Sequence, residues 1–405
     1  MDDDRIFVAK YRHVIIGRKE GQEQMEQRLR QNNIIEAFFL LVRAGLFGRT
    51  EHADSLLLDD VDWMEVYQLA KEQSVIGLAA EGMERLQDEW LKTHGSTLMP
   101  RQCSMRFIAY TLRMEKRNLA MNKFVAQLMG RLHKMDIHAF LMKGQGVAQN
   151  YTKPLWRTCG DVDLLLSEKD YEKAKDYLLP LASSSRSEIT HKQHLGLIIG
   201  GWQVELHGSL RCGFSFRIDK ELDKVCNETF YGGDMRTWTN SDVQIPLLGR
   251  ENDVIYVFIH FLNHFYKEGV GIRQICDWCR QLWSFRDSLD LGKLESQLKS
   301  MGVMSEWRAF GMYAVEYLGM PEEAMPFYAD DEKWKRKARR IHLFIMKTGN
   351  MGHNREGKKK NDSLLLKKMK STRRRCCDLA NHLMIFPLDT FRFSPSIFLN
   401  GLRHE

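Results

Sequence analysis

The spacing of hydrophobic residues divides the chain into a helical, a mixed and a second helical region. Residues 33–135 place apolar side chains three and four positions apart, beginning at "IIEAFFLLVRAGLF", which predicts amphipathic helices. Residues 136–250 contain short apolar runs separated by glycine turns, which is typical of strands. Helical spacing returns over 251–405, and residues 1–32 are a predicted polar leader. We therefore expect an α+β protein with a small mixed-sheet core flanked by helical regions.

Within the central region, the pattern predicts strands that alternate with helices. "IHAFLMKG" predicts a strand, and the glycine turn that follows it opens a helix. "GDVDLLL" predicts a second strand, and the next helix has Ser167 as its N-cap and Asp170 at the third position. "LGLII" and "WQVELHGSL", on either side of Gly200 and Gly201, predict a hairpin.

Two of these strands carry acidic residues. Asp161 and Asp163 are two positions apart in a strand and therefore share a face. Glu205 lies on the polar face of the later strand, so pairing of the two strands would bring three carboxylates together. Carboxylates this close raise one another's pKa values unless a cation compensates. A pair of Mg²⁺ ions, which prefer oxygen ligands and support phosphoryl or nucleotidyl transfer, is the expected partner.

Residues near these strands are candidates for binding phosphates. The turn from Gly144 to Gly146 offers backbone N–H groups, and Lys143 and Arg157 flank the strands with positive charge. Each feature has a simpler alternative, because the glycines can form an ordinary turn and Glu205 can face solvent on an edge strand. The motifs in this order are more specific than any one of them.

The stretch "FLMKGQGVAQNYTKPLWRTCGDVDLLL" followed by "VELHGSL" resembles the uncharacterised nucleotidyltransferase family of the DNA polymerase beta-like superfamily. The resemblance implies Mg²⁺-dependent transfer of a nucleoside monophosphate from an NTP to an acceptor hydroxyl, with release of pyrophosphate. It implies that Asp161 and Asp163 bind the metal and that Glu205, the third catalytic carboxylate, helps to hold one ion or accepts the proton of the attacking hydroxyl. Residues that fit the family's pattern and would line the nucleotide cleft are His264, Arg273 and Asp277. An ion pair between Arg273 and Asp277 is an equally good interpretation.

One position departs from the superfamily's pattern. Gln145 follows Gly144, where the usual residue is a serine that contacts the nucleotide phosphates. Gln145 is accordingly a candidate nucleotide-binding residue. The substitution also supports an alternative hypothesis, in which the protein is a catalytically inactive nucleotide-binding or regulatory scaffold.

Basic residues are concentrated near the C-terminus. Residues 332–375 hold 17 of the 60 Lys and Arg residues but 3 of the 53 Asp and Glu residues. Nucleic acid could bind through residues 355–375, although a solvated helix face is the simpler interpretation. No aromatic residue lies between Lys358 and Arg375, so this segment lacks a base-stacking surface. The acceptor could be a small molecule, a protein side chain or an RNA end.

The remaining patterns favour a cytoplasmic protein without a membrane partner. There is no run of about 18 apolar residues, and the eight scattered cysteines are expected to be reduced thiols. Cys276 and Cys279 lie in a predicted helix without a second pair at zinc-site spacing, which indicates structural thiols. His260 is interpreted as a structural histidine, and His191 and His194 are expected in a loop without a partner.

Overall fold

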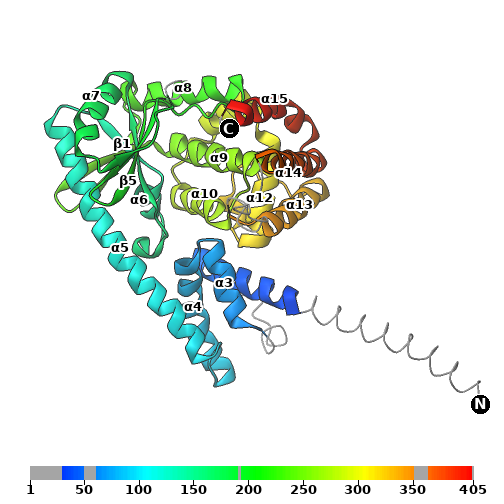
Figure 1. Ribbon diagram of the computed structural model, residues 1–405. Helices are drawn as coiled ribbons and strands as arrows, with labels where there is room; N and C mark the ends of the chain where they lie inside the picture. The colour runs from blue at the N-terminus through cyan, green and yellow to red at the C-terminus, as the bar shows by residue number, and fades with distance from the viewer. Residues whose placement is uncertain (1–29, 50–60, 190–192, 351–363, 404–405) are drawn as a thin grey trace, which may run out of the picture.

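The computed structural model describes residues 30–49, 61–189, 193–350 and 364–403 and has the expected α+β architecture (Figure 1). Seven strands form one mixed sheet in the order β3-β4-β5-β2-β1-β7-β6. Helices precede the sheet in the chain and follow it, as the sequence predicts. The strands are β1 (Ala139–Met142), β2 (Asp161–Leu166), β3 (Ser184–Ser185), β4 (His194–Ile199), β5 (Trp202–His207), β6 (Met235–Asn240) and β7 (Val243–Leu248).

Helices make up most of the rest of the described chain. Residues 30–47 are helical. The helices before and within the sheet region are α3 (Trp63–Glu72), α4 (Ile76–His94), α5 (Arg101–Lys134), α6 (Gly144–Ala148), α7 (Glu168–Leu178) and α8 (Phe216–Tyr231), with 3₁₀ turns η1 (Pro154–Trp156) and η2 (Leu179–Leu181). Those after it are α9 (Arg250–Lys267), α10 (Ile272–Phe285), α11 (Leu291–Met301), α12 (Met304–Leu318), η4 (Glu322–Ala324), α13 (Glu332–Thr348), α14 (Leu364–Ile385) and α15 (Pro387–Arg403).

Local sequence signals explain several of these elements. Gly200 and Gly201 both have positive φ angles, 58° and 81°, and connect β4 to β5 as the predicted hairpin. Ser167 caps α7, and its Oγ accepts a hydrogen bond from the Asp170 N–H at 3.2 Å. Both predictions are confirmed.

Three strands were not predicted from the sequence. The pattern indicated four strands, whereas β3, β6 and β7 extend the sheet at both edges. β6 alternates between exposed and half-buried residues, and β7 contains Pro246, so neither has the continuous apolar character of a core strand. Their hairpin turns at Ser241, and β7 then pairs in parallel with β1 through Leu141 and Leu247.

The two faces of the sheet belong to different cores. Side chains of α5 and α7 pack with Val162, Leu164 and Leu166 on one face. Leu165 and residues of α8 and α9 pack together on the other face, in the larger core that extends into the C-terminal helices. Figure 1 shows α9 and α10 between the sheet and helices α12 to α15. The face of β2 that carries Asp161 and Asp163 is therefore turned towards α9.

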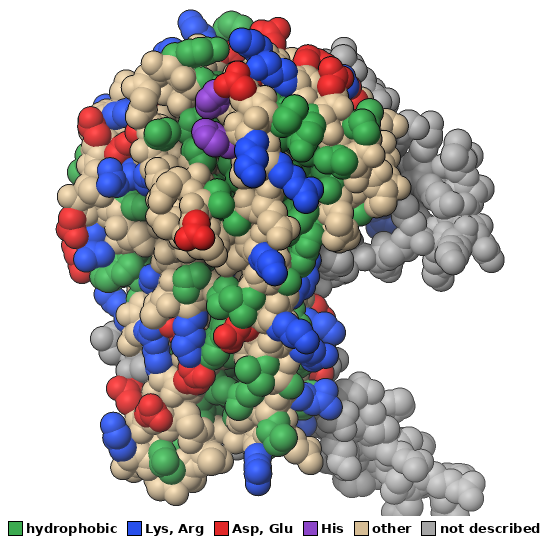
Figure 2. Space-filling view, turned by 90° about the vertical axis from the view of Figure 1, so that its left-hand side faces the viewer, with side chains coloured by type: hydrophobic (Ala, Val, Ile, Leu, Met, Phe, Trp, Pro, Cys, Tyr) green, Lys and Arg blue, Asp and Glu red, His purple; other side chains and the backbone are tan. Residues whose placement is uncertain are grey.

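A second basic element, which the sequence analysis did not single out, is α5. This 34-residue helix contains eight Lys and Arg residues and one Glu, and the eight basic residues are exposed. On the side of the molecule where α5 and α7 lie, charged side chains of both signs are interspersed with hydrophobic ones (Figure 2). Of the predicted segment 355–375, residues 355–363 lie outside the described residues.

The described helices include none that is long and apolar enough to cross a membrane. The eight cysteines are free thiols, and Cys276 and Cys279 are buried in α10. Burial raises the pKa of both of these thiols. They are thus held protonated, as expected of structural cysteines.

Helix α4 and the segment before β2 are in close contact, which can be tested at Gly77. A Cβ atom at this position would lie 1.9 Å from the Trp156 carbonyl oxygen. We expect Gly77→Ala to lower the free energy of unfolding by about 3 kcal/mol, measured by urea denaturation. Gly130→Ala, on α5 where a Cβ meets nothing within 4 Å, is the control and should raise stability by up to about 1 kcal/mol. Equal effects of the two substitutions would contradict this packing.

Buried Glu306 makes stability depend on pH. Burial, with Asp389 nearby, raises the pKa of Glu306 to about 8. The folded state therefore holds a proton that the unfolded state releases near pH 4.5, so this contribution is present at low pH and lost as the pH rises towards 8. We expect Glu306→Gln to match the wild type in thermal stability at pH 5 and to exceed it at pH 9. A constant difference between the two proteins across this range would refute the assignment.

Candidate active site

The parallel pairing of β2 and β5 brings the three predicted carboxylates together. Asp163 is the register partner of Glu205, and Asp161 is the partner of Gln203. One ligand oxygen from each of Asp161, Asp163 and Glu205 lies within 4.8 Å of the others. The pairing on which the sequence prediction depended is therefore confirmed.

Asp163 is the central residue of this cluster, and its carboxylate has two close partners. The residue is 1% exposed, Lys143 Nζ lies 2.7 Å from Oδ1, and His207 Nε2 lies 2.9 Å from the same oxygen. Burial alone would raise the pKa of Asp163, but Lys143 and the hydrogen bond from His207 outweigh it and hold this pKa well below its usual range. The reciprocal effect, set against burial, raises the pKa of Lys143. Asp163 and Lys143 are therefore both ionised.

The other two carboxylates have different environments. Burial and the neighbouring charge of Asp163 raise the pKa of Asp161. Glu205 accepts a hydrogen bond from His194 Nε2 at 3.2 Å, which lowers its pKa despite partial burial. Asp161 therefore carries the least compensated charge of the three, and it gains most from a bound cation.

Helix α9 packs over the face of the sheet that carries the three carboxylates. Lys143 Nζ lies 5.9 Å from the ring centroid of Tyr256, and burial raises the pKa of Tyr256 to about 12. Burial and the charge of Lys143 lower the pKa of His260. His264, one turn further along, pairs with Glu268 at 3.3 Å and packs edge-on against His260. His260, interpreted from sequence as structural, thus lies near the charged groups of the site.

The backbone between β1 and α6 is held in an unusual conformation. Lys143 has φ 49° and ψ −142°, a backbone conformation that residues other than glycine rarely adopt. Gly144 follows with φ 35°, and a Cβ there would lie 3.2 Å from the Asp161 carbonyl oxygen. This turn directs the Lys143 ammonium towards Asp163. Gly146 instead allows close packing on Leu247, since a Cβ would lie 3.0 Å from its Cδ2.

Gln145 contacts α5 rather than the carboxylates. Its side chain is buried, and Nε2 donates to Asn118 Oδ1 at 3.4 Å. Asn118 Nδ2 in turn donates to the carbonyl oxygens of Leu155 and Arg157, each at 2.7 Å. Gln145 is therefore part of a polar network that joins the turn after β1 to the segment before β2.

Arg157 and Asp277 form a buried ion pair with two hydrogen bonds. Arg157 Nε and Nη2 donate to the two carboxylate oxygens at 2.8 and 2.7 Å, and the Tyr151 hydroxyl donates to Oδ1 at 2.7 Å. Arg157 Nη1 contacts Thr158 O and Cys159 Sγ, so each guanidinium nitrogen is engaged. Asp277 is therefore paired with Arg157, and the alternative ion pair with Arg273 is not formed.

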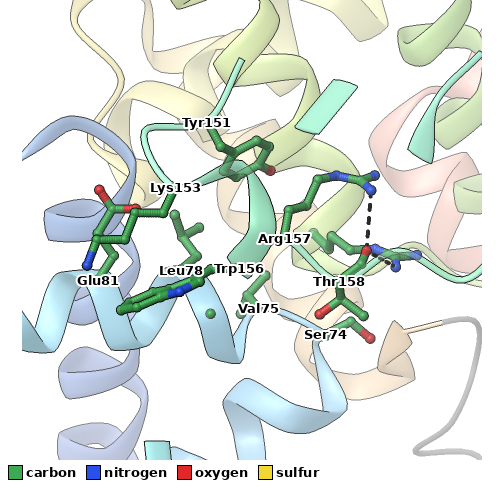
Figure 3. Close-up of a pocket in the computed structure, with 11 residues that line it drawn as sticks. Ser74, Val75, Leu78, Glu81, Tyr151, Lys153, Trp156, Arg157 and Thr158 are labelled. Carbon is green, nitrogen blue, oxygen red and sulfur yellow. Dashed lines mark hydrogen bonds between the residues drawn. The ribbon is translucent and has the colours of Figure 1, made fainter. Parts of the chain in front are cut away.

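Arg273 contacts the segment that connects Arg157 to Asp161. Its Nη1 donates to the Thr158 carbonyl oxygen at 3.1 Å, and its charge acts on Asp161. Its buried Nε has no hydrogen-bond partner in the described part of the chain. Figure 3 shows the adjoining pocket, lined by α4 and by the segment from Tyr151 to Thr158. Of the predicted nucleotide-binding arginines, Arg273 thus retains an unused donor.

Two histidines of the cluster were missed or misplaced by the sequence analysis. His194 was expected in a loop without a partner, but it begins β4 and pairs with Glu205. His207 shares the alternating polar face of β5 with Glu205, a signal that could have identified it. His191 lies outside the described residues.

The chain matches the model of a family described as uncharacterised nucleotidyltransferase over residues 59–319. The chain belongs to this family. A crystal structure of an antigenic nucleotidyltransferase-like protein from Paracoccidioides brasiliensis is similar to 49% of this chain, over 92% of its own length, with 14% identity and a TM-score of 0.31. No functionally curated protein matches the chain. Membership confirms the resemblance.

The Arg157–Asp277 pair generates a prediction about the stability of the folded chain. Asp277→Asn leaves a buried guanidinium without its counter-charge and should lower the free energy of unfolding by about 3–5 kcal/mol. The matched control is Asp223→Asn, which breaks an equally short but exposed pair with Arg211 and should cost less than about 1 kcal/mol. Chemical denaturation measures both. A loss for Asp277→Asn no larger than that of the control would show that the pair does not anchor the segment.

Proposed function

We propose that this protein is a Mg²⁺-dependent nucleotidyltransferase that moves a nucleoside monophosphate from an NTP to an acceptor hydroxyl. The observation that carries the proposal is the convergence of Asp161, Asp163 and Glu205 on one face of β2 and β5. Two divalent cations held by carboxylates neutralise the phosphates and the charge that develops during such a transfer.

The three side chains fit such cations in number and chemistry. Carboxylate oxygens are the ligands that Mg²⁺ prefers, and three of them leave coordination positions for phosphate oxygens and water. Asp161 and Asp163 would hold the cations together with Glu205. Asp161, with its raised pKa, shows the deficit of positive charge that a cation would remove.

Neighbouring cations of the chain supply the rest of the phosphate site. Lys143 already lies 2.7 Å from Asp163 and would also face the phosphates of a nucleotide beside this carboxylate. The unused Nε of Arg273 is a donor for a phosphate oxygen near Asp161. His264 lies on the facing side of α9, whereas Gln145, Arg157 and Asp277 would act through the segment that they position.

In the reaction, an acceptor oxygen forms a bond to the α-phosphorus, and the bond from that phosphorus to the oxygen bridging to the β-phosphate breaks. Pyrophosphate leaves, and the proton of the acceptor hydroxyl passes to Glu205, whose lowered pKa keeps it ionised. Catalysis would consist mainly of positioning and charge neutralisation.

The first test is calorimetric binding of the four NTPs in the presence and absence of Mg²⁺. Wild-type protein should bind at least one NTP in a Mg²⁺-dependent manner, because the metal offsets the repulsion between carboxylates and phosphates. The double variant Asp161→Ala and Asp163→Ala should lose this binding.

The control is Asp136→Ala, which removes an exposed carboxylate and should bind as the wild type does. Circular dichroism establishes that each variant is folded. Binding by the wild type without turnover of any acceptor would favour the inactive scaffold, and the absence of all NTP binding by folded protein would overturn the proposal.

A further inference from the structure

We propose that His194, Glu205 and His207 form a second cation site that takes a divalent transition-metal ion such as Zn²⁺. The three residues lie on one face of the β4–β5 hairpin. His194 and His207 are register partners across the hairpin, and Glu205 lies two residues before His207 on β5. This site differs from the carboxylate cluster in its donors, because two of its three ligands are imidazole nitrogens.

The geometry approaches that of a bound ion. Glu205 Oε2 lies 3.2 Å from His194 Nε2 and 3.8 Å from His207 Nε2, and all three ligand atoms lie within 4.8 Å of one another. Ligands at the usual distances around tetrahedral Zn²⁺ are separated by about 3.4 Å. The two imidazole rings stack with centroids 4.6 Å apart, and both Nε2 atoms lie within 4 Å of Glu205 Oε2. An ion bound here would replace the Nε2 protons that His194 and His207 now direct at Glu205 and Asp163, and each imidazole would then carry its proton on Nδ1.

Outer partners orient the carboxylate for this role. Gln203 Nε2 donates to Glu205 Oε1 at 2.6 Å, so Oε2 is the oxygen turned towards the histidines. Arg186 Nη2 donates to Gln203 Oε1 at 3.4 Å and thereby fixes which end of the amide faces Glu205. Hydrogen bonds of this kind hold metal ligands in place and are a usual part of metal sites.

The three side chains of the site are partly exposed to solvent. The side chains of His194, Glu205 and His207 are 28%, 14% and 15% exposed. Three protein ligands leave at least one coordination position open. Imidazole nitrogen favours Zn²⁺, Co²⁺ or Ni²⁺ over Mg²⁺, so the ion that binds here differs from the one expected at Asp161 and Asp163. An ion at this site also occupies Glu205 and so withdraws it from nucleotidyl transfer.

The test uses the metals alone and therefore does not depend on the proposed transfer activity. The 405-residue chain carries Cys376→Ser and Cys377→Ser, because adjacent exposed thiols bind the same metals. Zn²⁺ and Mg²⁺ binding are measured by calorimetry in the absence of nucleotide. Co²⁺ is added in a parallel titration, in which visible absorption reports nitrogen coordination.

We expect one Zn²⁺ per chain, bound at least about 100-fold more tightly than Mg²⁺ at this site. His194→Gln should weaken Zn²⁺ binding at least about tenfold and abolish the Co²⁺ absorption. His138→Gln, which alters an exposed histidine near Asp170, should change neither. Asp161→Asn should retain the Zn²⁺ site even if it loses Mg²⁺-dependent nucleotide binding.

Equal Zn²⁺ affinity in the parent protein and in folded His194→Gln would overturn the proposal, as would Zn²⁺ binding no tighter than that of Mg²⁺. His207→Gln, measured in the same way, provides a second variant if His194→Gln does not fold. If the wild-type protein binds Zn²⁺ at this site but binds no NTP, the proposed nucleotidyltransferase function is contradicted and the Zn²⁺ site is not.

Discussion

The buried charge of Asp163 is the constraint on which the site depends. An ionised carboxylate that is 1% exposed needs compensation, and Lys143 and His207 supply it from the ends of the two strands that flank β2. Because β1 and β5 also form the sheet, the same backbone pairing fixes both the acid and its partners. The strand register that packs the core therefore also determines which groups compensate the charge of Asp163.

The flanking helices complete this arrangement from outside the sheet. Asn118 of α5 holds the carbonyl oxygens before β2, and Asp277 of α10 holds the guanidinium of Arg157 in the same segment. Asp161 is the first residue of β2 and directly follows this segment. Residues that are more than 100 positions apart in the chain thus determine where the first carboxylate lies.

The sequence was informative wherever a signal is local. Alternation within a strand placed Glu205 on a polar face, the Ser167 cap began a helix, and Gly200 and Gly201 formed the hairpin. The contact between His194 and Glu205 could not be predicted from the sequence. It depends on the register of the β4–β5 hairpin rather than on any property of His194 itself. Strand β6, with its alternating half-buried residues, gained its place from β7 rather than from its own hydrophobicity.

The contacts of Gln145 leave the turn and Lys143 in place for an active site. A serine after Gly144 would act on phosphate directly, whereas Gln145 is directed away and stabilises the turn through Asn118. The turn still presents Lys143, held at φ 49°, to Asp163. The backbone geometry of the turn therefore places the Lys143 ammonium, at the end of β1, beside Asp163 of β2. The strain of that conformation, about 1–3 kcal/mol, persists because the surrounding packed structure holds the turn in place.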